Sequence, residues 1–555
     1  MKISCFIYRA IILLLCTIPI NIIGQSNLVH ISGKVTDVAT DAELSQVKIY
    51  ITDIDKGSID STFTNLSGLW EYDLTVTSVG ESPELPTQFS VTQNYPNPFN
   101  PSTTVDITLP EAGMVKVTIY NPLGQTIESY NEYLTRGAYS INWDARGSAG
   151  IYFINVKAKN ESITRKMTLL DGGHGNGLSG FRSAKNISEQ SGQFSRTFST
   201  IPIEIQTAKF GYVPYTVETA VKGGEYFDFK IETIHSASTL ADLHNDILEI
   251  MIEDPTYHLA DFHSYNHTDI PRLKLGGVDV QFFAVWVNPT THGQDSYDYA
   301  WAMINLFNNE ISLNPTTIGQ ARTKAEALSL NNENKIAAVM AVEGGHTIED
   351  DIGKLKALYQ AGMRYLTITW NNSTDWAISA QDSRSATVGL SEFGKEVIRT
   401  LDTLGVIIDV SHTGIKTIQD ILSTTTNPII ATHSGVRALR DHYRNLYDDQ
   451  IISIANSGGV IGIVFYPPFL SNTGSANIAT VVDHIDYIVN LVGIDYVGLG
   501  SDFDGIGTNT VNGLDDVSKF PDLTLELLRR GYSQTDVEKI LGGNFMRVFE
   551  QVCGE

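Results

Sequence analysis

Five side chains of the types that bind transition metals stand at the ends of short apolar runs in the C-terminal part of the chain. They are His244, Asp246, Glu343, His412 and His433. Zinc in proteins takes neutral imidazole nitrogens and carboxylate oxygens, and a catalytic zinc keeps one coordination position open. Three imidazoles and two carboxylates are too many for one open tetrahedral site, but they suit two ions that share a carboxylate. The pattern therefore predicts a site for two zinc ions.

The spacing of these residues suggests how they divide between the two ions. His244 and Asp246 are two positions apart in an extended segment, so both side chains point to the same side and can bind one ion. His412 and His433 would then bind the other ion, and Glu343 would bridge the pair. Two metals about 3.5 to 4 Å apart hold a bridging hydroxide and polarise a carbonyl group, so the predicted chemistry is hydrolysis.

A hydrolytic site also needs a group that moves protons, because attack on an amide carbonyl creates a leaving amine. Asp502 lies at the end of the last apolar run, in SDFDG, and is the predicted acid and base. The alternative is that Asp502 caps a helix or shapes a turn, since Asp504 and Gly505 beside it are typical turn residues. The register of Asp502 with the end of the run favours the catalytic interpretation.

The apolar runs that carry these residues are short, rich in β-branched side chains and bounded by turn residues, which is typical of strands. Eight of them occur in order, namely LADLHND, DVQFFAVWV, KIAAVMAVEGG, RYLTITW, GVIIDVSH, PIIATHS, GGVIGIVFY and YVGLGSDFDG. Helical stretches alternate with them, for example 297–313 and 392–404, and this alternation predicts a parallel sheet. Eight units predict a closed (β/α)8 barrel of the TIM type over residues 239–555. Active sites of such barrels lie at the carboxyl ends of the strands, which would bring the candidate ligands together.

The N-terminus has the pattern of an export signal. Lys2 and Arg9 give the first residues a positive charge, and an apolar stretch follows at residues 10–23. Gly24 is a small residue at the predicted cleavage point. Residues 1–24 are therefore predicted to be a signal peptide, and the mature protein is predicted to be secreted, periplasmic or at the cell surface. An uncleaved anchor is less favoured, because the stretch is shorter than the ~20 residues that span a bilayer. After cleavage the protein would keep no transmembrane anchor.

The chain is strongly acidic, with a formal net charge of -25 over 555 residues and a pI near 4.9. Nucleic acids and anionic membrane surfaces are bound through basic patches, so this balance disfavours both as partners. Cys5 and Cys16 lie within the predicted signal peptide, which leaves Cys553 alone and excludes an internal disulfide in the mature chain. Stability must therefore come from packed cores.

The residues before the barrel are predicted to form two all-β sandwich domains, because short runs of alternating apolar and polar residues are separated by Gly, Asp and Ser. GKVTDVATDAEL and TNLSGLWEYDLTV resemble the carboxypeptidase regulatory-like domain, a small β-sandwich. The later strands that this resemblance implies occur only in IEIQTAKFGYVPYTVETAVKGGEYFDFKI. This domain is thus predicted to be discontinuous, over residues 25–80 and 201–235.

A second resemblance lies between those two pieces. FSVTQNYPNPFNPSTTVDITLP, VKVTIYNPLGQTIESY and GIYFINVKAKNESITRKMTLL resemble the β-sandwich sorting domain of type IX secretion, over residues 85–170. The positions predict that this domain is inserted into the first one, and residues 171–200, rich in Gly, Ser and Asn, are predicted to be a flexible return linker. In that family the domain usually ends the chain, so a sorting role and a purely structural role both stay open.

The barrel region resembles a specific enzyme family. DLHND, TDIPRLKLGGVDVQFFAVW, VEGGH, RYLTITWNN, GVIIDVSH, PIIATHS, YRNLYDD and GLGSDFDG match, in this order, the membrane (renal) dipeptidase family of zinc metallopeptidases. The resemblance implies a di-zinc (β/α)8 enzyme that hydrolyses dipeptides, including those with a C-terminal D-residue, and family members are often homodimers. The roles it implies agree with those above: His244 and Asp246 on one zinc, His412 and His433 on the other, Glu343 as the bridge and Asp502 as the acid and base.

The same resemblance points to two substrate-binding residues. Arg444, in YRN, would hold the free carboxylate of a dipeptide, because a guanidinium binds a carboxylate through two parallel hydrogen bonds. The alternative is a surface Arg444 that pairs with Asp448 or Asp449. Trp370 stands where many family members have a His that contacts the substrate. Trp donates one N–H but cannot titrate, so either the substrate differs, or the His is dispensable, or Trp370 is simple packing.

Two other functions stay open on the sequence. One is a related barrel metallohydrolase acting on lactones, cyclic amides or phosphotriesters, although such enzymes usually bridge their metals with a carboxylated Lys, where this chain has Glu343. The other is a surface-binding protein whose barrel has lost catalysis. The complete ligand set disfavours that alternative, because unused buried ligands would lack a compensating cation. Hydrolysis of a dipeptide substrate is the leading hypothesis.

Overall fold

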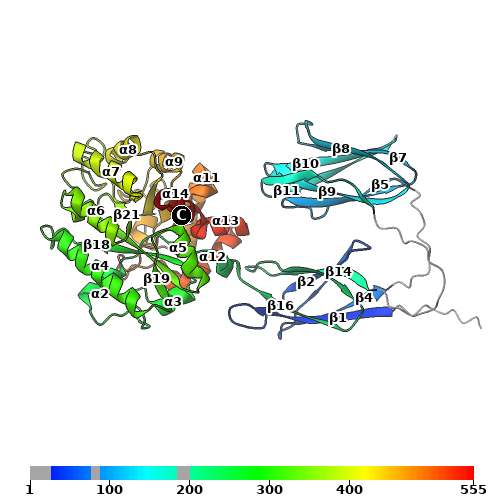
Figure 1. The fold of residues 1–555 in the computed structure, drawn as a ribbon, viewed down its shortest axis with the longest axis horizontal. Helices are drawn as coiled ribbons and strands as arrows, with labels where there is room; N and C mark the ends of the chain where they lie inside the picture. Colours follow the sequence, from blue (N-terminus) through cyan, green and yellow to red (C-terminus); the bar gives the residue numbers. More distant parts are fainter. Residues whose placement is uncertain (1–26, 77–87, 160, 184–199, 555) are drawn as a thin grey trace, which may run out of the picture. The chain divides into compact units, whose positions relative to one another are not determined.

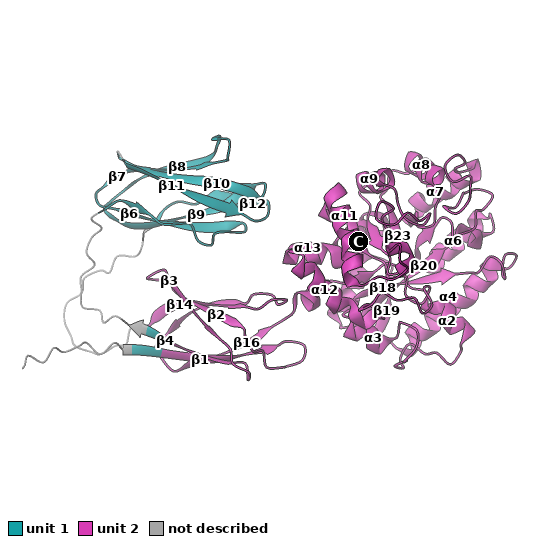
Figure 2. Cartoon of the chain, turned by 180° about the vertical axis from the view of Figure 1, so that it is seen from behind, with its two compact units in different colours: residues 1–29, 73–199 teal, residues 30–72, 200–555 magenta. Residues whose placement is uncertain are grey.

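The computed structural model describes residues 27–76, 88–159, 161–183 and 200–554. Contacts divide the chain into two compact units, one made of residues 1–29 and 73–199 and the other of residues 30–72 and 200–555, which Figure 2 colours separately. The predicted signal peptide lies outside the described residues.

Eight parallel strands close into a barrel in the C-terminal part of the chain (Figure 1). In chain order they are β17 (Ala241–Asp242), β18 (Val280–Trp286), β20 (Ile336–Glu343), β21 (Met363–Thr367), β22 (Ile407–Asp409), β23 (Ile429–Ser434), β24 (Ile461–Ile463) and β25 (Val497–Leu499). Each pairs in parallel with its neighbours, and β25 pairs with β17, which closes the ring. The short β19 (Ile318–Gln320) also pairs with β20. The predicted (β/α)8 barrel is confirmed.

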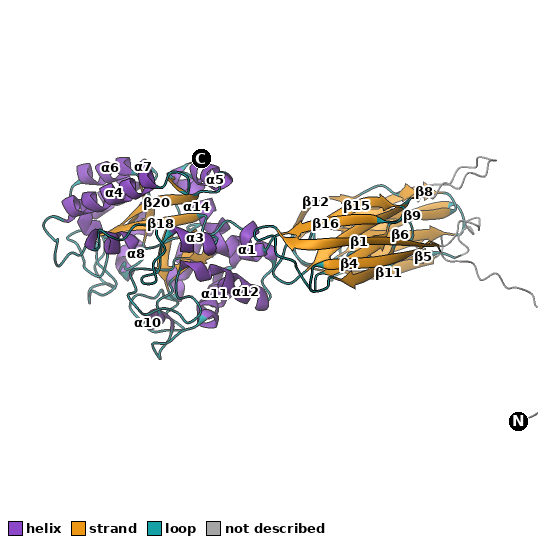
Figure 3. Cartoon of the chain, turned by 90° about the horizontal axis from the view of Figure 1, so that it is seen from below, coloured by secondary structure: helices purple, strands orange, loops and turns teal. Residues whose placement is uncertain are grey.

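Helices alternate with these strands and surround them (Figure 3). They are α1 (Ile234–Ala237), α2 (Ile247–Glu253), α3 (Ile270–Leu275), α4 (Ser296–Leu313), α5 (Lys324–Asn332), α6 (Ile352–Ala361), α7 (Glu392–Leu404), α8 (Ile415–Thr424), α9 (Asp448–Asn456), α10 (Pro467–Leu470), α11 (Ile478–Val492), α12 (Phe520–Arg529), α13 (Gln534–Glu538) and α14 (Asn544–Cys553). Short 3₁₀ or π segments are η1 (Gly345–Ile348), η2 (Ile494–Tyr496), η3 (Val517–Lys519) and η4 (Lys539–Gly543). Within the described ranges, no helix combines the length and the apolar character needed to cross a bilayer.

Helix α7 illustrates how local sequence sets the bounds of an element. The side chain of Ser391 accepts a hydrogen bond from the N–H of Gly394 and so caps the N-terminus. Val397 and Leu401, four positions apart, are both buried, so one apolar face packs against the rest of the fold. Gly405 ends the helix in the left-handed conformation, with φ of 70°, which glycine adopts without strain.

The interior of the barrel is packed rather than open. Every residue of β18 and β20 is buried, as parallel strands covered on both faces require. Phe282 of β18 stacks on Tyr365 of β21 at 5.4 Å, and its other contacts include the rings of Phe545 and Phe549 from α14. With the interior filled in this way, the polar groups that could do chemistry are left at the strand ends.

Two facing sheets precede the barrel in the same unit. One contains β16 (Glu225–Ile231), β1 (Asn27–Asp37) and β4 (Leu69–Val76), and the other contains β15 (Thr216–Val221), β14 (Ile201–Ala208), β2 (Lys48–Asp53) and β3 (Ser58–Phe63). β1 pairs in parallel with β16, and β2 pairs antiparallel with β14. The strands before residue 77 and after residue 200 therefore complete each other's sheets, which is the pairing that a discontinuous domain needs.

The other unit is a second all-β sandwich with its own core. One sheet contains β11 (Glu161–Leu169), β10 (Gly150–Ala158), β7 (Gly113–Tyr120) and β8 (Thr126–Leu134); the other contains β12 (Gly173–Leu178), β9 (Gly137–Gly147), β6 (Ser102–Leu109) and β5 (Ser90–Val91), with β13 (Arg182–Ser183) also on β9. Trp143 is buried in this core, 5.5 Å from the ring of Phe99 and 5.2 Å from that of Tyr152. The prediction of all-β structure before the barrel is confirmed.

Residues 171–200 were predicted to be a flexible linker, but the first part of this segment forms β12 and β13, which pair with β9. Glycine permits this close approach. A Cβ on Gly173 would lie 2.2 Å from the carbonyl oxygen of Ala145, and one on Gly175 would lie 2.3 Å from the carboxylate of Asp144. The glycine content that suggested flexibility thus has a packing reason here. Residues 184–199 of the predicted linker lie outside the described residues.

Gly500, which follows β25 and leads into Asp502, should tolerate no side chain. A Cβ at this position would lie 1.8 Å from the carbonyl oxygen of Thr432 on β23, and backbone cannot move aside as a side chain can. We expect Gly500→Ala to lower the free energy of unfolding of the barrel by about 3 kcal/mol or more in urea denaturation. Gly498→Ala is the control, because its Cβ would meet only the side-chain methyls of Val460 and Leu243, at 3.1 and 3.8 Å. Equal losses in the two variants would contradict this account.

Candidate metal centre

The structure places all five candidate ligands and Asp502 at the carboxyl ends of barrel strands. His244 and Asp246 follow β17, Glu343 ends β20, His412 follows β22, His433 lies in β23, and Asp502 follows β25. Because the strands are parallel and closed into a ring, these ends meet at one mouth although the residues are far apart in sequence.

His244, Asp246 and Glu343 form one compact group. Nε2 of His244 lies 3.4 Å from Oδ2 of Asp246 and 3.5 Å from Oε2 of Glu343. The three side chains are buried, and their nearest ligand atoms all lie within 4.8 Å of one another. One imidazole nitrogen and two carboxylate oxygens at this spacing could surround a single cation.

Glu343, His412 and His433 form a second group on the other oxygen of the same carboxylate. Oε1 of Glu343 lies 3.0 Å from Nε2 of His412 and 3.5 Å from Nε2 of His433. The two imidazole nitrogens lie 3.1 Å from each other. Glu343 therefore presents one oxygen to each group, which is the geometry that a bridging ligand requires.

Each histidine is oriented by a hydrogen bond on Nδ1. His244 Nδ1 lies 2.7 Å from the hydroxyl of Tyr365, which itself donates to the carbonyl of Leu243, and so the imidazole must donate to Tyr365. His412 Nδ1 lies 3.0 Å from the amide oxygen of Asn371. Because Nδ1 is occupied in this way, Nε2 is the nitrogen that faces Glu343 and can bind a metal once it is deprotonated.

The third histidine is held through a longer chain of hydrogen bonds. His433 Nδ1 lies 2.8 Å from the hydroxyl of Thr432, and that hydroxyl donates to Asp409 at 2.8 Å. Asp409 also accepts from the hydroxyl of Thr367 at 2.6 Å and from the N–H of Ser411 at 3.0 Å. This buried carboxylate ties β21, β22 and β23 together directly below the mouth and fixes the ring of His433.

Buried polar atoms without partners provide a test of whether a cation fits. Among the described residues, His244 Nε2, Asp246 Oδ1 and Glu343 Oε1 are buried and form no hydrogen bond. An unsatisfied buried polar atom is costly, and lone pairs of His412 and His433 that face each other at 3.1 Å repel. A divalent cation bound by these atoms would remove both penalties, so the donor set fits a metal.

The protonation states of the second group also suit metal binding, which needs neutral imidazole and ionised carboxylate. Burial, and then the charge of Arg444, lower the pKa of His412 to about 4. Burial, followed by His244, lowers the pKa of His433 well below its usual range. Burial alone would raise the pKa of Glu343, but the positive charge of His244 holds that pKa well below the usual range. Burial opposes the charge on His244, yet Tyr365, Asp246 and Glu343 raise the pKa of His244 well above its usual range, so a metal bound there must displace a proton.

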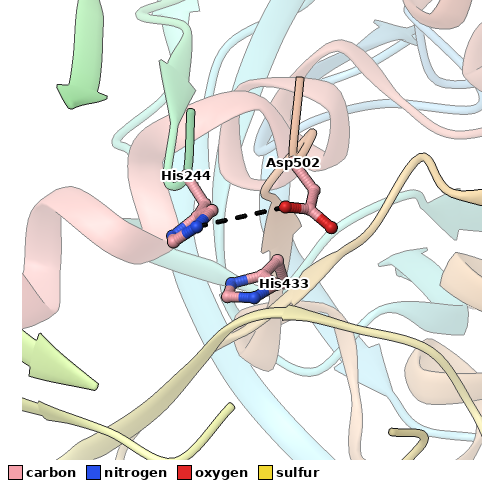
Figure 4. Close-up of side chains that lie close together, drawn as sticks. All are labelled: His244, His433 and Asp502. Atoms are coloured by element: carbon pink, nitrogen blue, oxygen red, sulfur yellow. Dashed lines mark ion pairs between the residues drawn. The ribbon is translucent and has the colours of Figure 1, made fainter. Parts of the chain in front are cut away.

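Asp502 lies beside both groups and is turned toward His244 (Figure 4). Its Oδ1 lies 4.0 Å from Nε2 of His244, and it can join His244 and His433 in a third cluster of ligand atoms. Burial, and then the neighbouring Asp246, raise the pKa of Asp502 well above the usual range. A carboxyl group with a raised pKa takes up a proton more readily than an ordinary aspartate, which is compatible with an acid and base role.

Asp502 takes part in the turn through its backbone, with φ of 63° and a carbonyl that accepts a hydrogen bond from the N–H of Gly505 at 3.2 Å, but its side chain lines the cavity. Asp504 accepts a hydrogen bond from the N–H of His267 at 2.8 Å, and its own N–H donates to the ring of His267 at 2.9 Å. At position 505 only glycine fits without a shift, because a Cβ there would lie 2.2 Å from Oδ2 of Asp246. These two residues shape the loop, which leaves the side chain of Asp502 at the cavity.

A cavity of about 410 Å³ opens above the ligand groups, and Arg444 lines it. Arg444 is only 3% exposed, so the predicted alternative of a surface cation is wrong. One nitrogen, Nη2, donates to the carbonyl of His433 at 3.2 Å, while Nε and Nη1 are buried and have no hydrogen-bond partner. The guanidinium thus keeps two unused donors beside the candidate metal centre.

Trp370 lines the same cavity, so it is more than core packing. Its ring lies 5.0 Å from that of Trp286 and 6.3 Å from that of His412. The two indoles form an aromatic wall of the cavity, and an aromatic wall cannot exchange protons with a substrate.

Several residues of the site were not predicted from the sequence. Tyr365, Asn371 and Asp409 orient the histidines, but nothing in their spacing marks them as partners. Glu249 also lines the cavity, on α2. Burial, and then Asp246, raise the pKa of Glu249 to about 8. A sequence signal did exist for Glu249, because it follows Asp246 by three positions and residues at this spacing share a helix face.

The fold and the site together are those of a closed (β/α)8 barrel protein with a buried centre of imidazoles and carboxylates at the mouth of the barrel. The sequence profile described as membrane dipeptidase, peptidase family M19, matches residues 229–554, and the chain belongs to this family. Dipeptidase 3 of Mus musculus is 33% identical over 321 residues, which is 56% of this chain and 64% of that protein. Dipeptidase 3 of Homo sapiens is 32% identical over 56% of this chain and 65% of that protein. The chain therefore spans less than two thirds of these relatives.

Solved structures share the barrel fold. The probable dipeptidase PvdM from Pseudomonas aeruginosa is 27% identical, with a TM-score of 0.54 over 58% of this chain and 96% of that one. A metallo peptidase from Rhodobacter sphaeroides, liganded with a phosphinate mimic of the dipeptide L-Ala-D-Ala, is 26% identical, with a TM-score of 0.53 over 57% of this chain and 99% of that one. A second profile, the secretion system C-terminal sorting domain, matches residues 93–169. The two resemblances stated for these regions are confirmed.

Metal removal should destabilise the barrel, because Asp246, Glu343 and Asp502 would lose the cation that offsets their mutual repulsion. Zinc at a hundredfold excess over its dissociation constant should add about 2.7 kcal/mol to the free energy of unfolding. Differential scanning calorimetry with chelator and with zinc measures the effect. We expect Glu343→Gln to lose most of the zinc response, whereas Asp375→Asn, which removes an exposed carboxylate after β21, keeps it. An unchanged response in Glu343→Gln would show that zinc binds elsewhere.

Proposed function

We propose that the protein is a di-zinc dipeptidase that hydrolyses the peptide bond of short substrates with a free carboxyl terminus. The observation that carries this proposal is Arg444, which lines the cavity above the two ligand groups and whose buried Nε and Nη1 donors have no hydrogen-bond partner. Membership of the membrane dipeptidase family supports the same reaction.

In this proposal the two ligand groups hold one zinc ion each. His244 and Asp246 would hold the first and His412 and His433 the second, while Glu343 offers one carboxylate oxygen to each group. Zinc is favoured over harder cations because three of the five ligands are imidazoles. Bound zinc supplies Lewis acidity, which polarises a carbonyl group and lowers the pKa of water.

Arg444 would position the substrate by its terminal carboxylate. A carboxylate accepts hydrogen bonds from one edge of a guanidinium, and Nε and Nη1 of Arg444 lie on different edges, each beside Nη2, so either of them could donate to the substrate carboxylate. The hydrogen bond from Nη2 to the carbonyl of His433 holds the guanidinium on the strand that carries a metal ligand. In a dipeptide only one residue separates the carboxylate from the peptide bond, so this anchor would bring that bond over the centre.

Asp502 would handle the protons of the reaction. Its carboxylate accepts a proton from the attacking water and returns it to the nitrogen of the leaving amine, so the net change is the addition of water across the C–N bond. A raised pKa suits both steps, because such a group accepts a proton more readily than an ordinary carboxylate and can then donate it. Trp370 would limit the cavity beside His412 without taking part in proton transfer.

We also propose that the enzyme is exported and accepts a C-terminal D-residue. The match to a secretion sorting domain over residues 93–169 supports export, together with the signal-like sequence of residues 1–24. The L-Ala-D-Ala mimic named for the related Rhodobacter sphaeroides structure supports the D-residue. The cellular location of a variant that lacks the internal domain would show whether this domain directs secretion.

A comparison of Ala-D-Ala with its C-terminal amide tests the proposed reaction and the role of Arg444 together. We expect the zinc-loaded protein to cleave Ala-D-Ala with a kcat/KM about a hundredfold above that for the amide, because the amide has no carboxylate for Arg444. Arg444→Gln should remove most of this difference, whereas Arg437→Gln, a nearby arginine paired with Asp441, should keep it. Hydrolysis of lactones or cyclic amides in preference to any dipeptide would contradict the proposal.

A further inference from the structure

Glu249 has no task in the reaction above, although it lines the same cavity as Arg444 and Asp502. It is half-buried on α2, and the charged groups that act on it most strongly are Asp246, Glu253 and Glu343, which are all acidic. A carboxylate that is partly removed from water among other acids is unfavourable unless a cation approaches it. The cavity is open to substrate at this point, so a substrate can bring that cation.

The order of strands around the barrel puts Glu249 across the cavity from Arg444. Arg444 lies in the loop that follows β23, and β18 is the fourth strand from β23 in either direction around the ring of eight, which is the opposite wall. Trp286 ends β18 and lines the cavity there. Glu249 comes from the helix that follows β17, the neighbour of β18, and α2 packs against β18.

A bound dipeptide would therefore point its N-terminal residue at Trp286 and Glu249. With the carboxylate on Arg444 and the peptide bond over the ligand groups, the C-terminal residue occupies the side of β23. The N-terminal residue is the only remaining part of the substrate, and the opposite wall is the space left for its side chain. An indole face accommodates a methylene chain, and a carboxylate beyond it pairs with a cationic end group.

We propose that Trp286 and Glu249 form the subsite for the N-terminal side chain and select dipeptides that begin with lysine or arginine. This inference rests on the proposed dipeptidase function. Lysine and arginine combine an apolar stem with a positive charge at its end, and this matches an aromatic wall followed by an acid. Apolar and acidic N-terminal side chains would leave Glu249 without a counter-charge.

The test compares Lys-Ala with norleucyl-Ala, whose side chain has a similar length but no charge. We expect the zinc-loaded protein to favour Lys-Ala in kcat/KM, and Glu249→Gln to reduce the Lys-Ala to norleucyl-Ala ratio about ten- to a hundredfold, the range of a charge-assisted hydrogen bond. Asp298→Asn is the control: it removes one negative charge from an exposed position on α4 that is not among the groups acting on Glu249, and the ratio should not change.

Two results would overturn the proposal. One is an unchanged ratio in Glu249→Gln; the other is an equal loss for both substrates, which would assign Glu249 to the α-ammonium group that all dipeptides share. Calorimetric binding of the two dipeptides to the metal-free protein gives a second readout that needs no turnover, and Glu249→Gln should abolish any preference for Lys-Ala there. Failure to cleave any dipeptide would contradict the proposed function instead, and the binding comparison would still decide the role of Glu249.

Discussion

The shared carboxylate of Glu343 is the interaction on which the rest of the barrel mouth depends. Its two oxygens lie 3.5 Å from His244 and 3.0 Å from His412, so one side chain joins two groups of ligands that come from opposite parts of the ring. Such a density of buried acids and lone pairs is unfavourable without cations. The histidine tautomers, the network around Asp409 and the left-handed backbone of His412, with φ of 66°, all hold this arrangement in place.

Substrate recognition is attached to the same framework. The hydrogen bond from Arg444 to the carbonyl of His433 couples the proposed carboxylate anchor to a strand that carries a candidate metal ligand, and Asn371 both lines the cavity and orients His412. A shift of either loop would therefore disturb binding and metal geometry together.

The barrel and the ligand cluster could be predicted because both depend on short-range pattern. Each strand is a buried apolar run, and polar residues such as Glu343 and His412 directly follow it, so parallel pairing alone brings them together. The partners of the histidines could not be predicted in this way. Tyr365 forms a hydrogen bond with His244 across the barrel, and Asp409 accepts one from Thr432 on the next strand. Both contacts depend on the closure of the ring and on the register of its strands. The glycines of β12 suggested flexibility, because their packing on β9 cannot be seen in composition.

Anomalous diffraction at the zinc absorption edge, on crystals grown with excess zinc, tests the central claim most directly. The account predicts two peaks per barrel about 3.5 to 4 Å apart, with one oxygen of Glu343 on each ion, His244 and Asp246 on the first and His412 and His433 on the second. A single peak, or a mouth without zinc in which the carboxylate of Glu343 faces away from the histidines, would contradict it.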